Sequence, residues 1–241
     1  MRYAVLSDVH SNLEALSAVL ETIGRMRIDS LLCLGDLVGY GPNPDECVEL
    51  LRSRAQPVVR GNHDHAAVTP GHERYFNAWG QAAIRWTRGI ASRENLAYLA
   101  GLPLTARAGG ALLVHASPSV PEAWRYVIDA DDAAEEFAAF GERVCLIGHS
   151  HVPLVAEWSA GESLDVTAPE VPLAEGRRYI VNVGSVGQPR DGDPRAAFGV
   201  LDLDESRVEL CRVAYDASRT REKIRGAGLP LFLGDRLLRG Q

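Results

Sequence analysis

Short apolar runs alternate with amphipathic segments along the N-terminal part of the chain. Arg2–Leu6, Ser30–Leu34 and Pro57–Val59 have the length and apolar character of buried strands. Apolar residues that recur every three or four positions predict one helix from about Asn12 and another over Pro44–Leu51. Strands that alternate with helices in this way indicate parallel strands joined by helical crossovers.

The same periodicity predicts where the first helix begins and where further helices follow. Ser11 and Glu14 have the spacing of a capping box at the start of the first helix. Between about residues 70 and 100 the chain has the pattern of a helical insertion, in which Trp79 and Trp86 are expected to face the core.

The second half of the chain is richer in short β-like stretches. Further strands are predicted at Ala111–Val114, Val144–Ile147, Val152–Glu157, Arg178–Val183, Ala197–Leu203 and Val208–Val213. A helix is expected near Asp131–Phe140, and the tail, about 216–241, has the pattern of one helix with an irregular end. We therefore predict an α/β protein with two facing sheets, the second largely antiparallel, and helices outside, in one domain over residues 1–241.

Composition and charge narrow the classes of function. With 46% hydrophobic and 24% charged residues, the 241-residue chain has the balance of a folded globular protein. A formal net charge of −7 disfavours non-specific binding to DNA or RNA, whose phosphate backbones favour a basic surface. We find no stretch suited to a signal peptide or a membrane span, and the four cysteines form no Cys-x-x-Cys pair. These features predict a cytoplasmic protein with reduced thiols.

Side chains of the types that bind metals follow five of the predicted strands. Loops beyond the carboxyl ends of parallel strands converge in α/β sheets, and ligands usually bind there. Five of the seven histidines fall at these positions. The five groups are Asp8-Val9-His10, Gly35-Asp36, Gly61-Asn62-His63-Asp64, His115 and Gly148-His149-Ser150-His151.

Carboxylate, imidazole and amide ligands without a thiolate predict a particular class of metal ion. Such a set suits Mn²⁺, Fe, Zn²⁺, Co²⁺ or Ni²⁺ better than a metal that prefers sulfur. The seven candidate ligands suffice for two ions if one carboxylate bridges them. Side chains two residues apart turn to one side of an extended backbone, so Asp8 with His10, and His149 with His151, could each serve a common metal centre.

The order of these groups resembles the calcineurin-like metallophosphoesterase superfamily. Its members carry D-x-H, G-D, G-N-H-[DE], H and G-H-x-H blocks in that order, and all five occur here between Asp8 and His151. The later segment 182–187 also resembles the small bacterial members. The resemblance implies a four-layer α/β/β/α sandwich, in which two facing mixed sheets are covered by outer helices.

The resemblance also implies a role for each residue of the blocks. The implied metal ligands are Asp8, His10 and His151 for the first ion, Asn62, His115 and His149 for the second, and Asp36 as the bridge. Mn²⁺ is the expected ion at both positions. His63 would be a catalytic residue that binds no metal, and Asp64 would orient or polarise its ring. A metal-bridging hydroxide would attack the phosphorus, while His63 would protonate the departing oxygen or stabilise the developing charge.

Each of these residues also has an ordinary structural interpretation. Asp8 and Asp36 could cap helices, and Gly61-Asn62 is typical of a turn. A single histidine after a strand, such as His115, commonly has a structural role. The occurrence of all five blocks in order favours metal ligation over these alternatives.

The second block carries information about the substrate. Protein Ser/Thr phosphatases of the superfamily read G-D-x-V-D-R-G there, with an arginine that grips phosphate, whereas Tyr40 takes the arginine position here. The difference disfavours a phosphoprotein substrate, and the Gly-Tyr-Gly-Pro variant resembles small bacterial phosphodiesterases and relatives described as diadenosine-polyphosphate hydrolases. Arg60 and Arg190 are the candidates for a guanidinium that binds substrate phosphate.

Three hypotheses of function follow from these features. The first is a dinuclear metal-dependent hydrolase of phosphodiesters or phosphoanhydrides of small molecules, nucleotides included. The second is a phosphomonoesterase, including a protein phosphatase, and the third is a metal-binding scaffold without catalysis. The complete ligand set, with His63, favours an enzyme. The expected partner is a small phosphorylated substrate rather than a nucleic acid or a membrane, and a homo-oligomer is compatible with the sequence.

Overall fold

The strands of the chain pair into two sheets, and each sheet draws on distant parts of the sequence. The computed structural model describes residues 1–166 and 168–241, and within them two six-stranded sheets form. The first contains, in spatial order, β3 (Ala55–Val58), β2 (Ser30–Cys33), β1 (Arg2–Leu6), β11 (Ala196–Asp202), β12 (Arg207–Val213) and β9 (Glu170–Pro172). The second contains β4 (Thr105–Ala108), β5 (Ala111–Val114), β6 (Val144–Ile147), β10 (Arg178–Asn182), β7 (Leu154–Ser159) and β8 (Glu162–Asp165).

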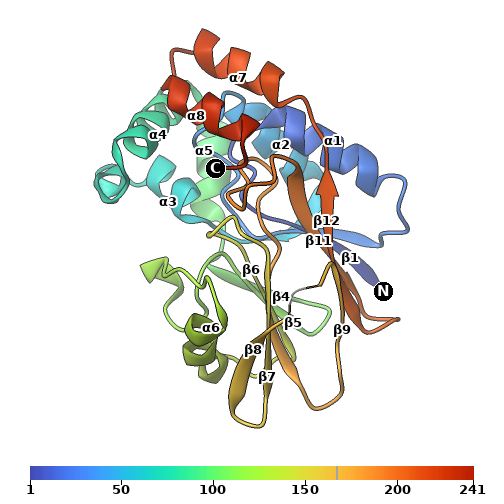
Figure 1. Ribbon diagram of the computed structural model, residues 1–241. Helices are drawn as coiled ribbons and strands as arrows, with labels where there is room; N and C mark the ends of the chain where they lie inside the picture. Colours follow the sequence, from blue (N-terminus) through green and yellow to red (C-terminus); the bar gives the residue numbers. More distant parts are fainter. Residues whose placement is uncertain (167) are drawn as a thin grey trace.

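Both sheets are mixed, and the prediction of two facing sheets is confirmed. In the first, β1, β2 and β3 run parallel, while β11, β12 and β9 add antiparallel pairs. In the second, β5, β6 and β10 run parallel, while β4, β7 and β8 pair antiparallel. Antiparallel pairing was expected mainly in the second sheet, but it is equally present in the first, because β11 returns beside β1 (Figure 1).

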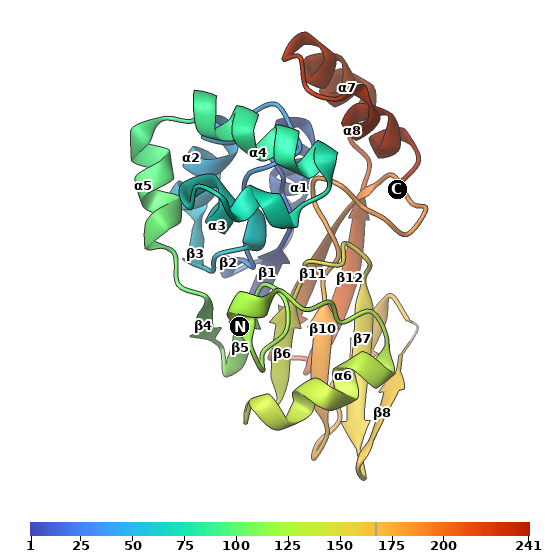
Figure 2. The ribbon, with the colours of Figure 1, turned by 90° about the vertical axis from the view of Figure 1, so that its left-hand side faces the viewer.

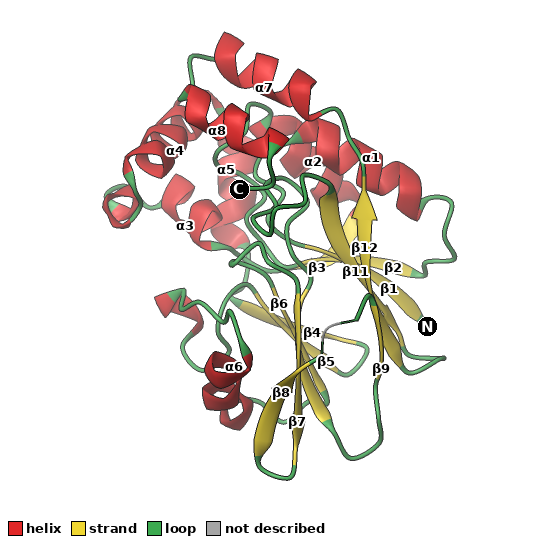
Figure 3. Cartoon of the chain, in the orientation of Figure 1, coloured by secondary structure: helices red, strands yellow, loops and turns green. Residues whose placement is uncertain are grey.

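Helices cover the outer faces of the sheets. The helices of the described chain are α1 (Leu13–Ile23), α2 (Pro44–Arg54), α3 (Asn62–Val68), α4 (Ala78–Ile90), α5 (Arg93–Gly101), α6 (Ala130–Glu136), α7 (Ala217–Gly226) and α8 (Leu231–Asp235). Short 3₁₀ turns occur at η1 (His72–Tyr75), η2 (Pro121–Ala123), η3 (Phe137–Ala139) and η4 (Arg236–Leu238). Most helices gather beside the first sheet, whereas α6 lies against the second (Figure 3).

Central strands such as β6 and β11 are apolar because both of their faces are buried. Ala4 of β1 belongs to the core beneath α1, and its neighbour Val5 belongs to the core between the sheets. Leu146 of β6 lies in this central core, and its neighbour Ile147 lies in the core beneath α6. Three apolar layers thus separate four layers of secondary structure, which confirms the α/β/β/α architecture. Figure 2 looks onto the second sheet, with α6 lying in front of it.

Two details of the helices differ from the predictions. Asn12, not Ser11, caps α1: its Oδ1 accepts a hydrogen bond from the Ala15 amide at 3.1 Å, while Ser11 has a left-handed φ of 52°. Trp79, expected in the core, is 43% exposed and stacks on Phe232 with ring centroids 4.0 Å apart. Its side of α4 faces α8 rather than a sheet. Among the described residues no helix has the length and apolar character needed to cross a bilayer.

Candidate metal centre

The loops that carry the predicted ligands are tied to one another by main-chain hydrogen bonds. After β1 and β2, the Asp8 amide donates to the Gly35 carbonyl at 3.0 Å, and the His10 amide donates to the Asp36 carbonyl at 2.9 Å. After β5 and β6, the Gly148 amide donates to the His115 carbonyl at 2.9 Å. The loops at the carboxyl ends of the parallel strands therefore have fixed positions relative to each other.

Several of the predicted ligands adopt the left-handed backbone conformation. Their φ angles are 53° for Asp8, 48° for His10, 53° for Asp36, 68° for His149 and 64° for His151. The expectation that the backbone of each D-x-H or H-x-H pair is extended is therefore wrong. The first and third residues of each motif adopt the left-handed conformation instead. Such conformations cost about 1–3 kcal/mol each in a non-glycine residue and concentrate at functional sites.

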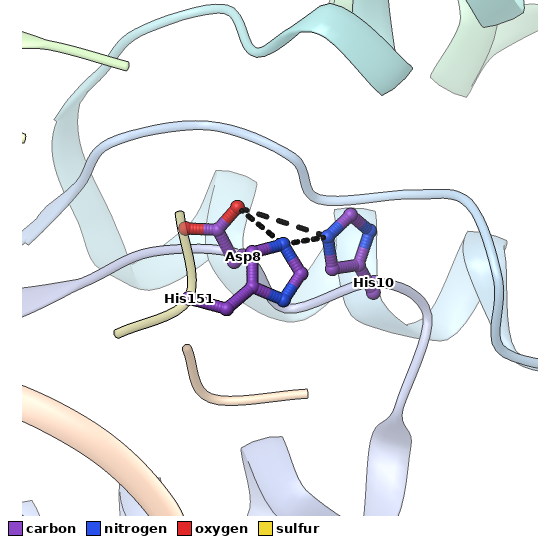
Figure 4. Close-up of side chains that lie close together, drawn as sticks. All are labelled: Asp8, His10 and His151. Atoms are coloured by element: carbon purple, nitrogen blue, oxygen red, sulfur yellow. Dashed lines mark hydrogen bonds and ion pairs between the residues drawn. The ribbon is translucent and has the colours of Figure 1, made fainter. Parts of the chain in front are cut away.

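Asp8, His10 and His151 form the first group of potential ligands (Figure 4). Nε2 of His10 lies 3.1 Å from Nε2 of His151, and Oδ1 of Asp8 lies 3.2 Å from the latter nitrogen and 3.7 Å from the former. All three side chains are buried. One cation between these atoms would satisfy them together.

Asp36, Asn62, His115 and His149 bring a second group of donor atoms to the same place. Nε2 of His115 lies 3.4 Å from Oδ2 of Asp36 and 3.1 Å from Oδ1 of Asn62. A ring nitrogen of His149 lies within 4.8 Å of the donor atoms of His115 and Asp36. Oδ2 of Asp36 is also 3.6 Å from Nε2 of His10, so this carboxylate stands between the two groups.

Main-chain carbonyls set the orientation of three of the imidazole rings. Nδ1 of His10 donates to the Val38 carbonyl at 3.1 Å, and Nδ1 of His115 donates to the Leu34 carbonyl at 2.8 Å. Nδ1 of His151 donates to the Gln188 carbonyl at 2.6 Å. With the proton on Nδ1, the Nε2 lone pair of each ring points at the site, as metal-binding histidines require.

The electrostatics of the site fit divalent cations. Burial alone would raise the pKa of Asp8 and Asp36. The facing histidines together lower both pKa values by more than burial raises them, so both carboxyls are ionised. Oδ1 of Asp8 is buried and receives no hydrogen bond within the described part of the chain. Burial lowers the pKa of His149 to about 3 and also lowers that of His151, so both rings are neutral at pH 7 and available to a metal.

His63 lies in the cavity, whereas Asp64 is placed differently from the prediction. The His63 ring lines the cavity beside Asp36, and burial lowers its pKa to about 4. The Asp64 carboxylate was expected to orient this ring, but it accepts the amides of Leu37, Val38 and Gly61 at 2.8, 3.2 and 3.0 Å. Asp64 therefore ties the loop after β2, through Leu37 and Val38, to the start of α3, where Gly61 lies.

The two candidate arginines point in different directions. A cavity of about 620 Å³ opens over the site, and Arg190 lines it together with His63 and His149. Arg60 is not among the lining residues, and its guanidinium donates to the Ala100 carbonyl at the end of α5. The prediction that Arg60 contacts substrate is therefore not supported by its position, because α5 draws the side chain away from the cavity.

Sequence reasoning did not assign a role to the segment 182–188, which supports the ligand loops from behind. The Asn182 side chain donates to the Gly148 carbonyl at 2.6 Å and to Ser150 Oγ at 2.9 Å. Ser185 Oγ donates to the Asp8 carbonyl at 2.8 Å. The resemblance of this segment to small bacterial phosphoesterases indicated that it belongs to the site. Its hydrogen-bond partners could not be predicted, because they are distant in sequence.

The aromatic wall of the cavity was also missed. The Tyr126 ring stacks on His149 with centroids 4.2 Å apart, and Phe76 meets the His63 ring edge-on at 4.5 Å. Trp124 lines the same cavity from the loop after η2. No spacing marks these residues in the sequence, because they lie outside the five blocks.

Comparisons with known proteins agree with this geometry. A family model described as the calcineurin-like phosphoesterase superfamily domain matches residues 1–206. An uncharacterized protein of Methanocaldococcus jannaschii is 41% identical, over 99% of this chain and 98% of its own length. A crystal structure of a metallophosphoesterase from Sphaerobacter thermophilus is 42% identical, covers 100% of this chain and 99% of its own, and superposes with a TM-score of 0.89.

A second solved structure extends the likeness of the fold alone. It is a hypothetical protein from Pyrococcus horikoshii, 23% identical, with a TM-score of 0.80 over 100% of this chain and 98% of its own. The residue blocks, the two mixed sheets and the family match lead to one assignment. The chain belongs to the calcineurin-like phosphoesterase superfamily and is a metallophosphoesterase, a hydrolase of phosphoric esters.

Proposed function

We propose that the enzyme hydrolyses phosphodiesters or phosphoanhydrides of small molecules, nucleotides included, at a centre of two divalent cations, with Mn²⁺ as the expected ion. The main support for this proposal is the position of Asp36, whose Oδ2 lies 3.6 Å from Nε2 of His10 and 3.4 Å from Nε2 of His115. The proposed ligands are Asp8, His10 and His151 on one side, Asn62, His115 and His149 on the other, and Asp36 between them.

The chain's own residues supply positioning and proton transfer. Bound divalent cations would neutralise phosphate charge and lower the pKa of a coordinated water. The His63 ring lines the cavity beside Asp36. It is neutral at pH 7 in the free protein, and a bound phosphate anion would raise its pKa, so that it would protonate the departing oxygen or stabilise the charge that develops there. Asp64 acts only indirectly, by holding the loop that carries Asp36.

The cavity supports a small substrate. Its volume of about 620 Å³ lies within the range that small-molecule sites usually have. Phe76, Trp124 and Tyr126 line it, and such rings suit an aromatic group on the substrate. Tyr40, which takes the place of the phosphate-gripping arginine of the phosphoprotein phosphatases, lines the cavity beside His63 with ring centroids 4.3 Å apart, and its uncharged ring cannot supply a guanidinium fork. This favours a diester or an anhydride over a phosphoprotein.

Turnover of four substrates by the Mn²⁺-loaded protein tests the proposal. Bis-p-nitrophenyl phosphate and diadenosine tetraphosphate represent diesters and anhydrides, whereas p-nitrophenyl phosphate and a phosphopeptide represent monoesters. We expect higher kcat/KM for one of the first two. A preference for the phosphopeptide would favour a protein phosphatase. A protein that binds Mn²⁺ and hydrolyses none of the four would favour a scaffold without catalysis.

Two variants separate catalysis from metal binding. His63→Gln should retain two metal ions and lose about 10²–10⁴-fold in kcat, the range typical of a lost general acid. Asp36→Asn should lose occupancy at both positions, measured by elemental analysis after dialysis. Asp131→Asn, at an exposed residue of α6, is the matched control and should behave as wild type. Full activity of His63→Gln would refute the proton-donor role.

A further inference from the structure

Two arginines, Arg190 and Arg236, line the cavity, and neither forms an ion pair with an Asp or Glu side chain of the described residues 1–166 and 168–241. Arg190 Nη2 donates to Gln188 Oε1 at 2.9 Å, and its buried Nε has no partner there. Arg236 Nε donates to a main-chain oxygen of Gln241, the last residue of the sequence, and its terminal nitrogens have no Asp or Glu side chain as a partner in the described residues. In a chain of net charge −7, this pair is a local concentration of positive charge.

Both arginines line the same cavity as Tyr40, and the Arg190 guanidinium carbon lies 5.8 Å from the centroid of the Tyr40 ring. Burial and the positive charge of Arg190 lower the pKa of Arg236 to about 10. Like charges held together at the wall of a cavity are stabilised when an anion binds between them.

Arg236 reaches the cavity from a segment outside the family domain. The family match ends at residue 206, whereas Arg236 begins η4 near the end of the chain. In Figure 1 the C-terminal helices α7 and α8, drawn in red, lie beside the N-terminal helices and the ligand loops. The phosphoesterase fold is therefore supplemented at its site by a cation that this C-terminal segment contributes.

The C-terminal segment is fixed in place by specific contacts. Thr220 Oγ1 donates to Asn12 Oδ1 at 3.0 Å, and Lys223 Nζ pairs with Glu14 at 2.5 Å. Leu233 and Leu237 pack with Tyr40 in one apolar cluster. The position of Arg236 thus depends on a docked segment rather than on a free tail.

We propose that Arg190 and Arg236 form an anion subsite that binds a second phosphate group of the substrate, apart from the ester bond that is cleaved. The subsite restores, from the C-terminal segment, a phosphate-binding guanidinium that the chain lacks at Tyr40. Guanidinium groups bind phosphate oxygens by paired, charge-assisted hydrogen bonds. The inference rests on the proposed function and narrows the substrate to esters or anhydrides that carry at least two phosphate groups.

Product binding tests the subsite without turnover. The probes are thymidine 3′,5′-bisphosphate and thymidine 5′-monophosphate, titrated calorimetrically into Mn²⁺-loaded protein. Wild type should bind the bisphosphate at least about tenfold more tightly, the size expected for a charged hydrogen bond. Arg236→Gln should remove this preference, and Arg236→Lys should retain part of it. Arg239→Gln, at an exposed neighbour, should keep the full preference.

A parallel kinetic comparison distinguishes failure of the subsite from failure of the proposed function. The substrates are thymidine 5′-(p-nitrophenyl phosphate) with and without a 3′-phosphate, so that the scissile bond is the same. We expect the ratio of the two kcat/KM values to fall toward one in Arg236→Gln. Hydrolysis without any bisphosphate preference in wild type would overturn the subsite and leave the function standing. A bisphosphate preference without hydrolysis of either ester would do the opposite.

Discussion

Asn182 offers a direct test of whether the segment 182–188 holds the ligand loops in place. Its buried amide donates to the Gly148 carbonyl at 2.6 Å and to Ser150 Oγ at 2.9 Å, and its Oδ1 accepts from the Gly184 amide at 2.9 Å. Asn182→Ala removes all three hydrogen bonds. The Gly184 amide, after β10, then loses its acceptor, while the Gly148 carbonyl keeps the Ser150 amide at 2.8 Å and the ligand loop loses its link to Asn182.

The structure sets the size of the expected effect. An orphaned buried polar group costs about 1–3 kcal/mol, so loss of the partner of the Gly184 amide should lower the free energy of unfolding by about 1–3 kcal/mol. For a chain of this length, that loss corresponds to a fall of about 2–12 °C in the thermal midpoint. Because Asn182 positions the loop of His149 and His151, metal affinity should also weaken, by about 10–100-fold.

Thermal unfolding with and without Mn²⁺, together with calorimetric titration of Mn²⁺, measures both effects. Asn95→Ala is the matched control, since Asn95 is also buried and donates to Asp45 at 2.7 Å, but lies on α5 away from the ligands. It should lower stability without changing the Kd for Mn²⁺. If Asn182→Ala bound Mn²⁺ within twofold of wild type, Asn182 would have only a structural role.

Two further predictions concern the ligands themselves. Gly61→Ala would place its Cβ 2.0 Å from Asp36 Oδ1. We therefore expect the free energy of unfolding to fall by about 1–3 kcal/mol and elemental analysis to find less than the full complement of metal. Full metal content would show that the loop moves to accommodate the methyl group. Burial lowers the pKa of His115, but Asp36 and Asp8 raise it more, to about 9. Since the protonated ring cannot bind metal, Mn²⁺ affinity should rise by about tenfold per pH unit from pH 7 and level off above about 9, as measured by competition with a chelating dye. The stability of the metal-free protein should depend on pH in the opposite direction. The raised pKa of His115 stabilises the folded state fully below about pH 6.5, the pKa of the ring in the unfolded chain, and this contribution is lost as pH rises through about 9. A pH-independent affinity would contradict the assignment of His115 as a ligand.

Much of the fold could be predicted because its causes are local. Runs such as Val144–Ile147 are apolar at every position since both faces are buried, and this is visible in the sequence. The break between α4 and α5 was not predicted. It lies at Ser92, whose Oγ accepts a hydrogen bond from the Asn95 amide at 3.2 Å and so caps α5. The short strands β8 and β9 were missed as well, because exposed strands of three or four residues carry little apolar pattern.

The sequence by itself determined the candidate metal ligands and the family resemblance, since carboxylates and imidazoles at the ends of apolar runs can be recognised one block at a time. Only the tertiary structure decided how they meet. Left-handed turns at Asp8 and His151, the return of β11 beside β1, and the docking of Arg236 all depend on partners far away along the chain. Such contacts arise when layers pack, and no local pattern of residues encodes them.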